Sequence, residues 1–95
     1  MTAIEVRHRP DRSHYELFVD GQLAGVADYR LGPDGVAVFP HTVIDGHRRG
    51  QGLGAALVRG ALDAERAAGH TVVPQCWYVA EFIDRHPDYA DLLAG

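Results

Sequence analysis

The chain lacks lysine, since all nine of its basic side chains are arginine. The absence of lysine excludes Schiff-base chemistry and the phosphate-binding lysine of a P-loop. Cysteine is nearly absent as well, and a single residue, Cys76, cannot form an intramolecular disulfide. No apolar run approaches the roughly 18 residues of a membrane-spanning helix, and the N-terminus lacks the apolar segment of a signal peptide. We therefore expect a cytoplasmic protein with no membrane partner.

Positive charge is also scarce, because the formal net charge at pH 7 is −4. This balance argues against a nucleic-acid partner, since a general nucleic-acid binder needs a basic surface. The hydrophobic fraction of 46% in 95 residues is typical of a small globular domain. We expect one domain spanning residues 1–95, present as a monomer or a weak dimer.

Apolar and polar side chains alternate along the first half of the chain, which is the pattern of half-buried strands. Short turns separate the segments, among them Asp20-Gly21 and Gly32-Pro33-Asp34-Gly35. Consecutive strands joined by short turns form an antiparallel meander. The predicted strand segments are Ile4–His8, Tyr15–Val19, Gln22–Leu31 and Val36–Ile44.

The second half changes to helical spacing from Leu53 onward, and Gly69 stands where this helix is expected to end. A short apolar strand, Thr71–Val73, precedes a second predicted helix at Trp77–Arg85, and residues 88–93 add one more turn. The resulting order β-β-β-β-α-β-α predicts an α/β (α+β) fold. Its sheet is mixed and mainly antiparallel, with one parallel crossover.

The segment Arg48–Ala55 places alternating glycines behind two arginines, between a strand and a helix. Glycine loses the most conformational freedom on folding, so such clustering needs a reason. Helix N-terminal N–H groups and nearby arginines suit a phosphate. The spacing fits the dinucleotide-binding pattern G-x-G-x-x-G/A. A dinucleotide site is not expected, however, because hairpin strands precede the loop and the apolar Val72-Val73-Pro74 stands where an acidic residue would bind the ribose. A P-loop is excluded because no G-K-[ST] follows.

Several separated motifs resemble those of a known family. Arg49–Gly54 matches the Q/R-x-x-G-x-G/A acyl-CoA-binding motif of the GNAT N-acetyltransferase superfamily. Together with His41-Thr42, Pro74-x-Cys76 and His86-Pro87-x-Tyr89, this motif resembles a family of very small GNAT-like proteins of similar length. The resemblance implies a minimal GNAT (acyl-CoA N-acyltransferase) fold. It also implies an acetyltransferase that depends on acetyl-CoA.

The resemblance further implies how acetyl-CoA binds as a co-substrate. Backbone N–H groups of the glycine loop would hold its pyrophosphate, and the strand before the loop would pair with its pantetheine arm. No H-x-x-x-H or C-x-x-C spacing supports a metal site. The implied CoA-binding residues are Thr42, Val43, Ile44, Arg48, Arg49, Gly50, Gln51, Gly52, Leu53, Gly54 and Ala55.

Cys76 and His41 are the candidate catalytic residues. Cys76 precedes a predicted helix, whose N-terminus favours a nucleophilic thiolate, although a lone cysteine is often a buried core residue. His41 lies on the strand expected to flank the thioester, where it is a general base, a thiolate partner or a polar strand end. Full-length GNAT enzymes usually carry a tyrosine as the leaving-group acid where this chain has Ile83, and small relatives carry a glutamate where it has Val43. These departures add weight to a route through Cys76.

We therefore expect acetyl transfer from acetyl-CoA to an unidentified amine on a small molecule or a protein, with Cys76 as a candidate acetyl carrier. An alternative from another class is a non-catalytic regulatory module that binds CoA or acyl-CoA. A third interpretation is a small interaction domain that binds no CoA species.

Overall fold

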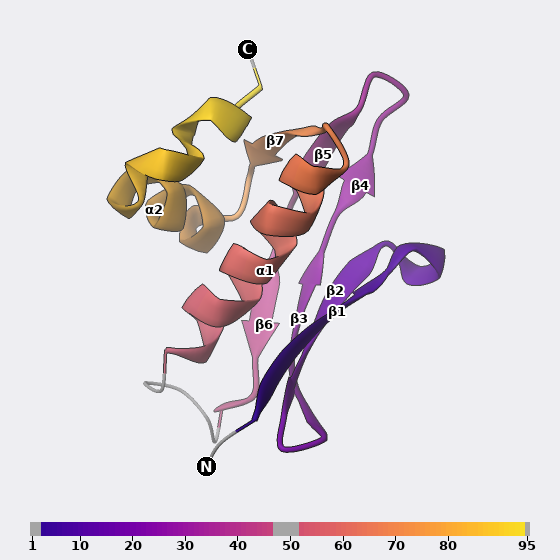
Figure 1. Cartoon of the computed structure of the whole chain (residues 1–95), viewed down its shortest axis with the longest axis vertical. Helices are drawn as coiled ribbons and strands as arrows, with labels where there is room; N and C mark the ends of the chain where they lie inside the picture. The colour runs from indigo at the N-terminus through magenta and orange to yellow at the C-terminus, as the bar shows by residue number, and fades with distance from the viewer. Residues whose placement is uncertain (1–2, 47–51, 95) are drawn as a thin grey trace.

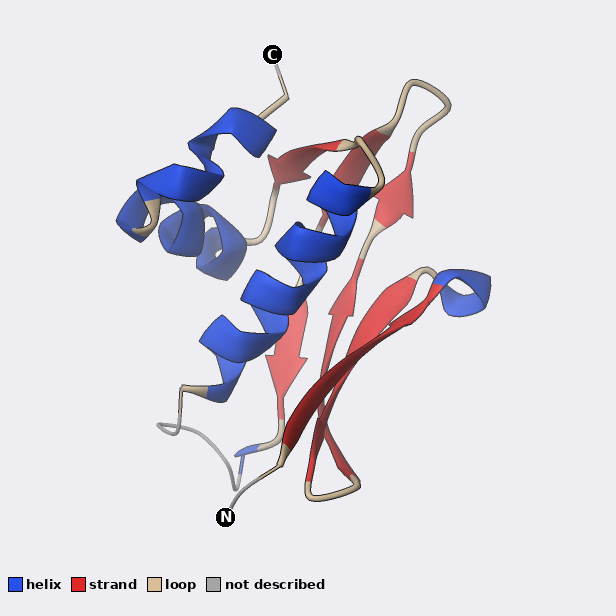
Figure 2. Ribbon diagram, viewed as in Figure 1, coloured by secondary structure: helices blue, strands red, loops and turns tan. Residues whose placement is uncertain are grey.

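Strands fill the first half of the chain and helices most of the second (Figures 1 and 2). The computed structural model describes residues 3–46 and 52–94. In chain order the elements are β1 (Ile4–Arg9), η1 (Pro10–Arg12), β2 (His14–Val19), β3 (Gln22–Asp28), β4 (Arg30–Leu31), β5 (Val36–Phe39), β6 (Thr42–Ile44), α1 (Leu53–Ala67), β7 (Thr71–Pro74), α2 (Trp77–Arg85) and η3 (Pro87–Leu92). Both η1 and η3 are 3-10 helices.

The strands form two sheets. In the first, β1, β2, β3 and β6 lie side by side in that order, and every neighbouring pair is antiparallel. In the second, β4 pairs antiparallel with β5, and β5 pairs parallel with β7. The parallel pair is connected through α1, as a crossover requires. The predicted fold class, with a mixed and mainly antiparallel sheet, is therefore confirmed.

Two of the predicted strands are interrupted, so the prediction of continuous strands over residues 22–31 and 36–44 is wrong. At Tyr29, between β3 and β4, the backbone N–H donates to the carbonyl of Ser13 over 3.0 Å. Between β5 and β6, Pro40 has no N–H to donate to a ladder. The interruptions let β6 stay with β3 while β5 turns to β7, and they divide one expected sheet into two.

Helix α1 lies across the four-stranded sheet and contacts each of its strands (Figure 2). Leu57, Val58, Ala61 and Leu62 recur at helical spacing and are all buried on this face. Gly60 allows the close approach to β1, because a Cβ at this position would lie 2.8 Å from a methyl carbon of Val6. The hydrophobic core therefore lies between α1 and the sheet.

The C-terminal segment covers part of the outer edge of β7. Leu93 forms an isolated parallel bridge with Val72, and the N–H of Ala94 donates to the Val72 carbonyl over 3.0 Å. The helix α2 lies beside α1, with η3 next to it (Figure 1). Within residues 3–46 and 52–94, no helix is both long and apolar enough to cross a membrane.

Candidate active site

The chain paths of β6 and β7 diverge beside α2 (Figure 1). Strands β5 and β7 run together until Phe39 lies opposite Pro74. Beyond this pair, the chain after β7 turns into α2, whereas β6 continues along β3, with Val43 opposite Val26. In the described part of the chain β3 is the only strand beside β6. The other edge of β6 is therefore open to pairing with an added extended ligand.

Cys76 lies where the two paths separate. It is the N-cap residue of α2, and its backbone N–H donates to the Phe39 carbonyl over 2.8 Å. The side chain is 7% exposed, and Sγ lies 3.8 Å from the hydroxyl oxygen of Thr42. The thiol is thus held between the first residue of β6 and the positively polarised end of α2. The structure brings together two predicted site residues, Thr42 and Cys76.

The N-terminus of α1 forms another part of the site. Gly52 precedes the helix with φ of 73°, a backbone conformation that favours glycine, and it offers no side-chain cap. The first intrahelical bond runs from the N–H of Ala56 to the carbonyl of Gly52, so earlier helical N–H groups have no intrahelical acceptor. Gly52, Leu53, Gly54 and Ala55 thus lie at the start of α1, before the first residue whose N–H is bonded within the helix, and their role in binding an anion stays a prediction. Predicted ligands outside the described residues are Arg48, Arg49, Gly50 and Gln51.

Gly54 has a role in packing that the sequence pattern did not reveal. A Cβ at Gly54 would lie 2.6 Å from the hydroxyl oxygen of Tyr78 and 2.8 Å from the ring carbon that bears it. Burial, and secondarily the charge of Glu81, raises the pKa of Tyr78, which keeps its phenol neutral. Trp77 is 72% exposed and meets Tyr78 edge-on, with ring centroids 5.7 Å apart. The start of α2 therefore places Tyr78 against the start of α1, with the exposed Trp77 ring beside Tyr78.

His41 has a different partner from Cys76. Its Nε2 lies 3.2 Å from Oδ2 of Asp28, and its side chain is 66% exposed. Successive residues of an extended strand point to opposite faces, so His41 and the neighbouring Thr42 face different sides of the sheet. The geometry does not pair His41 with the Cys76 thiol, and it favours a role on the far side of β6.

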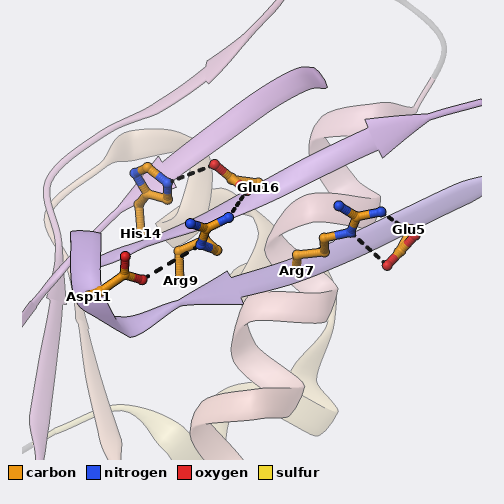
Figure 3. Close-up of polar contacts among 6 residues, drawn as sticks. All are labelled: Glu5, Arg7, Arg9, Asp11, His14 and Glu16. Atoms are coloured by element: carbon orange, nitrogen blue, oxygen red, sulfur yellow. Dashed lines mark hydrogen bonds and ion pairs between the residues drawn. The ribbon is translucent and has the colours of Figure 1, made fainter. Parts of the chain in front are cut away.

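A polar cluster on that far side went unnoticed in the sequence. His14 Nε2 lies 3.1 Å from a carboxylate oxygen of Glu16, and His14 Nδ1 lies 3.9 Å from Asp28. The other oxygen of Glu16 lies 3.7 Å from Arg9 (Figure 3). Figure 3 shows Arg9, His14 and Glu16 on the near side of the strands, with α1 behind them. None of these residues belongs to a recognisable sequence motif, and only the strand register brings them close to His41.

Metal ligands are not assembled in the described ranges. Among residues 3–46 and 52–94, no group of three or more His, Cys, Asp or Glu side chains is placed to hold a metal ion.

Comparison with known proteins identifies the architecture. A family model described as GCN5-related N-acetyl-transferase matches residues 14–92. A GCN5-like protein from Staphylococcus aureus, solved by NMR, superposes with a TM-score of 0.73 at 17% identity, covering 100% of this chain and 92% of that one. None of the curated proteins compared with the chain matches it.

Two larger structures share the same fold. One is an aminoglycoside acetyltransferase from an uncultured soil metagenomic sample, solved with sisomicin, at a TM-score of 0.54 and 15% identity. The other is a GNAT-family protein from Desulfovibrio desulfuricans, at a TM-score of 0.54 and 23% identity. Both matches cover 82% of this chain but only 53% and 54% of those proteins, so the chain spans about half their length. At these identities the similarity shows the fold alone.

Proposed function

Because this chain belongs to the GCN5-related N-acetyltransferase family, we propose that it transfers an acetyl group from acetyl-CoA to an amine. The observation that carries the proposal is the divergence of β6 from β7. The start of α1, with N–H groups that have no intrahelical acceptor, lies at one part of this site and the Cys76 thiol at another. An extended thioester ligand with a phosphate group at one end can contact both parts of the site.

In this proposal the backbone binds the donor. The pyrophosphate lies against the N–H groups of Gly52–Ala55, with Arg48 and Arg49 adding positive charge. The pantetheine arm, which carries amide groups, pairs with the open edge of Thr42–Ile44 as an added strand. This arrangement directs the thioester toward Cys76, because Thr42 at the start of β6 contacts its thiol.

Two routes lead from the thioester to the product. In the direct route the amine attacks the thioester carbonyl carbon, the C–S bond breaks, and CoA leaves as a thiolate. In the stepwise route the Cys76 thiolate attacks first, and CoA leaves with the electron pair of the broken C–S bond. The amine then attacks the carbonyl carbon of acetyl-Cys76, whose C–S bond breaks and returns the Cys76 thiolate. His41, on the opposite side of β6 from Cys76, accepts a proton from the amine in either route.

Thermal stability and intact mass test the proposal together. Acetyl-CoA and CoA should each raise the melting temperature, because a ligand that binds only the folded state stabilises it, and NAD should not. Stabilisation by NAD alone would contradict the ligand assignment. Binding without release of free CoA in the presence of amines would favour a regulatory module.

The single cysteine makes the stepwise route easy to test. After incubation with acetyl-CoA, the added mass of one acetyl group should appear on the wild-type protein and be absent from Cys76→Ser. Unreacted protein at full acetyl-CoA occupancy would leave the direct route as the mechanism. The variant should bind acetyl-CoA as the wild type does, which the same melting experiment checks.

A further inference from the structure

A shallow groove lies over β3 and β6 on the face of the four-stranded sheet that is opposite α1, which we call the outer face. Side chains from β2, β3 and β6 reach this face, because their neighbours Tyr15, Ala27 and Thr42 point toward the helices. The groove encloses about 270 Å³. Its lining residues are Leu23, Ala24, Gly25, Val26, Val43 and Asp45.

The groove has an apolar floor that is open to solvent. Leu23 is 53% exposed and Val43 is 62% exposed, and both belong to the few large apolar side chains that the described residues leave exposed. Val26 lies opposite Val43 in the β3–β6 register. Exposed apolar side chains that gather in one hollow commonly mark a binding site.

The Asp28–His41 pair stands at the next outer-face position of the same two strands. Val26 and Val43 face each other, and two residues farther along, the N–H of Asp28 donates to the His41 carbonyl over 3.2 Å. Asp28 also lies 3.9 Å from His14, which contacts Glu16. Glu16 is largely buried, and its Oε1 has no hydrogen-bond partner within the described structure. Glu16 Oε1 also lies 3.7 Å from Arg9, so the accessible carboxylate at this end of the groove is that of Asp28.

We propose that this groove binds the acceptor, an apolar small molecule ending in a primary amine, with its ammonium group on the Asp28–His41 pair. The proposal rests on the proposed acetyltransferase function and deepens it. Charge complementarity favours this occupant, since the partly exposed carboxylate of Asp28 stands beside the groove. Leu23, Val26 and Val43 contact its apolar part.

The position of the groove suits transfer. Val43 lines the groove from β6, and its neighbour Thr42 faces the Cys76 thiol from the same strand. Donor and acceptor therefore meet at β6 from opposite faces. A second cavity of about 350 Å³ also combines apolar side chains with one carboxylate, Asp84, but its lining residues come from β7, α2, η3 and the C-terminal segment rather than from β6.

Each group has a defined role in the proton and bond changes of acetyl transfer. One proton of the ammonium passes to His41, whose Nε2 is oriented by Asp28. The freed nitrogen lone pair forms the C–N bond at the thioester carbonyl, the C–S bond breaks, and the sulfur leaves as a thiolate. The second proton from nitrogen converts the thiolate to a thiol. Asp28 is thus a positioning residue and His41 the proton acceptor.

NMR of the ¹⁵N-labelled full chain with CoA tests binding separately from turnover. Hexylamine should shift the amide signals of Val26, Val43 and His41, whereas hexanoate, which has the opposite charge on a similar chain, should not. Signals that shift in the Ala80–Asp84 segment instead, or no shift, would overturn the proposal. Groove signals that move with protein concentration would show that a second copy of the chain occupies the groove, which also overturns it.

The same spectra separate this inference from the proposed function. CoA alone should shift the signals of Leu53–Ala55 at the start of α1. CoA shifts without hexylamine shifts would leave the proposed function standing and reject the groove. The reverse pattern would reject CoA binding while the groove still binds an amine. Asp28→Asn should weaken hexylamine binding by roughly two- to fivefold, as for an exposed ion pair, with CoA binding unchanged.

Kinetics with hexylamine as acceptor test the proton step. His41→Ala should lower the rate of acetylhexylamine formation by about 100-fold, and added imidazole should restore part of it. Equal rates for His41→Ala and wild type, or a loss that imidazole does not restore, would overturn the role of His41. His86→Gln is the matched control and should keep the wild-type rate, because His86 contacts the Phe82 carbonyl at the end of α2.

Discussion

Tyr15 and Glu16 are neighbours on β2, yet each anchors a different polar cluster. Tyr15 points toward α1, where its hydroxyl donates to Glu65, and the other carboxylate oxygen of Glu65 lies 3.0 Å from His70 Nδ1. Glu16 points to the outer face and contacts His14 and Arg9. The two clusters use similar groups. Glu16 is buried like Glu65, but the outer cluster extends to Asp28 and His41, whose side chains are substantially exposed and accessible to a ligand.

The centre of the inner cluster is buried, and only its two ends, His8 and His70, reach solvent. Glu65 is 2% exposed, and His8 stacks on Tyr15 at 4.3 Å between ring centroids. His8 also lies 2.7 Å from the hydroxyl of Tyr29, whose pKa is raised by burial and by the charge of Glu65. Groups with satisfied hydrogen bonds in a dry interior make a specific and rigid core. The outer cluster becomes more exposed toward His41, so its groups can exchange partners with a ligand.

The largest expected effect is the loss of Glu65. Glu65→Ala removes the hydrogen-bond partner of buried Tyr15 and of partly buried His70, and should lower the free energy of unfolding by about 3 kcal/mol. Urea unfolding at neutral pH measures it. Glu16→Ala is the matched change on the outer face and should lower the free energy of unfolding by only about 1 kcal/mol. Equal losses would show that the two clusters contribute alike.

The second-largest effect is expected from alkaline pH, which should lower the free energy of unfolding through Tyr15 of the inner cluster. Burial, and secondarily the hydrogen bond to Glu65, raises the pKa of Tyr15 far above its ordinary value. Above about pH 10 the unfolded chain loses this phenol proton while the folded chain keeps it, so unfolding releases a proton. The contribution of Tyr15 is therefore complete below pH 10 and is lost above it, by about 1.4 kcal/mol per pH unit.

Tyr15→Phe isolates this effect. In urea titrations between pH 10 and pH 11, the free energy of unfolding should fall less steeply for the variant than for the wild type. The two slopes should differ by up to about 1.4 kcal/mol per pH unit. The hydroxyl is removed with little change in packing, so the comparison concerns the proton. Parallel pH dependences in the two proteins would contradict the assignment.

A smaller effect is expected from the charge of Glu16. Glu16→Gln keeps the shape but removes the ion pairs with Arg9 and His14, and the free energy of unfolding should fall by less than about 1 kcal/mol. Because Arg9 is partly exposed, salt should screen its share of this loss. Urea unfolding at low and at high salt measures the difference. A loss as large as that of Glu65→Ala would place Glu16 among the residues that hold the fold.

The smallest expected effect on stability belongs to Asp28. Its carboxylate and the His41 ring are both substantially exposed, so Asp28→Asn should change the free energy of unfolding by less than about 0.5 kcal/mol. The same variant should weaken hexylamine binding, as proposed above. A variant that loses stability but keeps amine binding would reverse the contrast between the two clusters.

The sequence predicted the elements well because their signals are local. Alternation along β2, the apolar repeat of α1 and Gly69, whose φ is 77°, each depend on near neighbours in the chain. The interruptions at Tyr29 and Pro40 were missed, since a strand can continue or break at such residues depending on its partners. The roles of Cys76 and His41 stay predictions, and the structure adds that they face different sides of β6.

The sequence by itself determined the strand-rich first half and the helix–strand–helix second half, the glycine-rich start of α1 and, through its separated motifs, the family that the match over residues 14–92 confirms. Tertiary structure alone decided that Gly54 must accommodate Tyr78, that Cys76 meets Thr42, and that an outer-face cluster reaches β6. The physical reason is how far apart in the sequence the interacting residues are. Periodicity and turns arise between neighbouring residues, whereas these contacts join residues from separate elements whose faces are set by strand register and by burial.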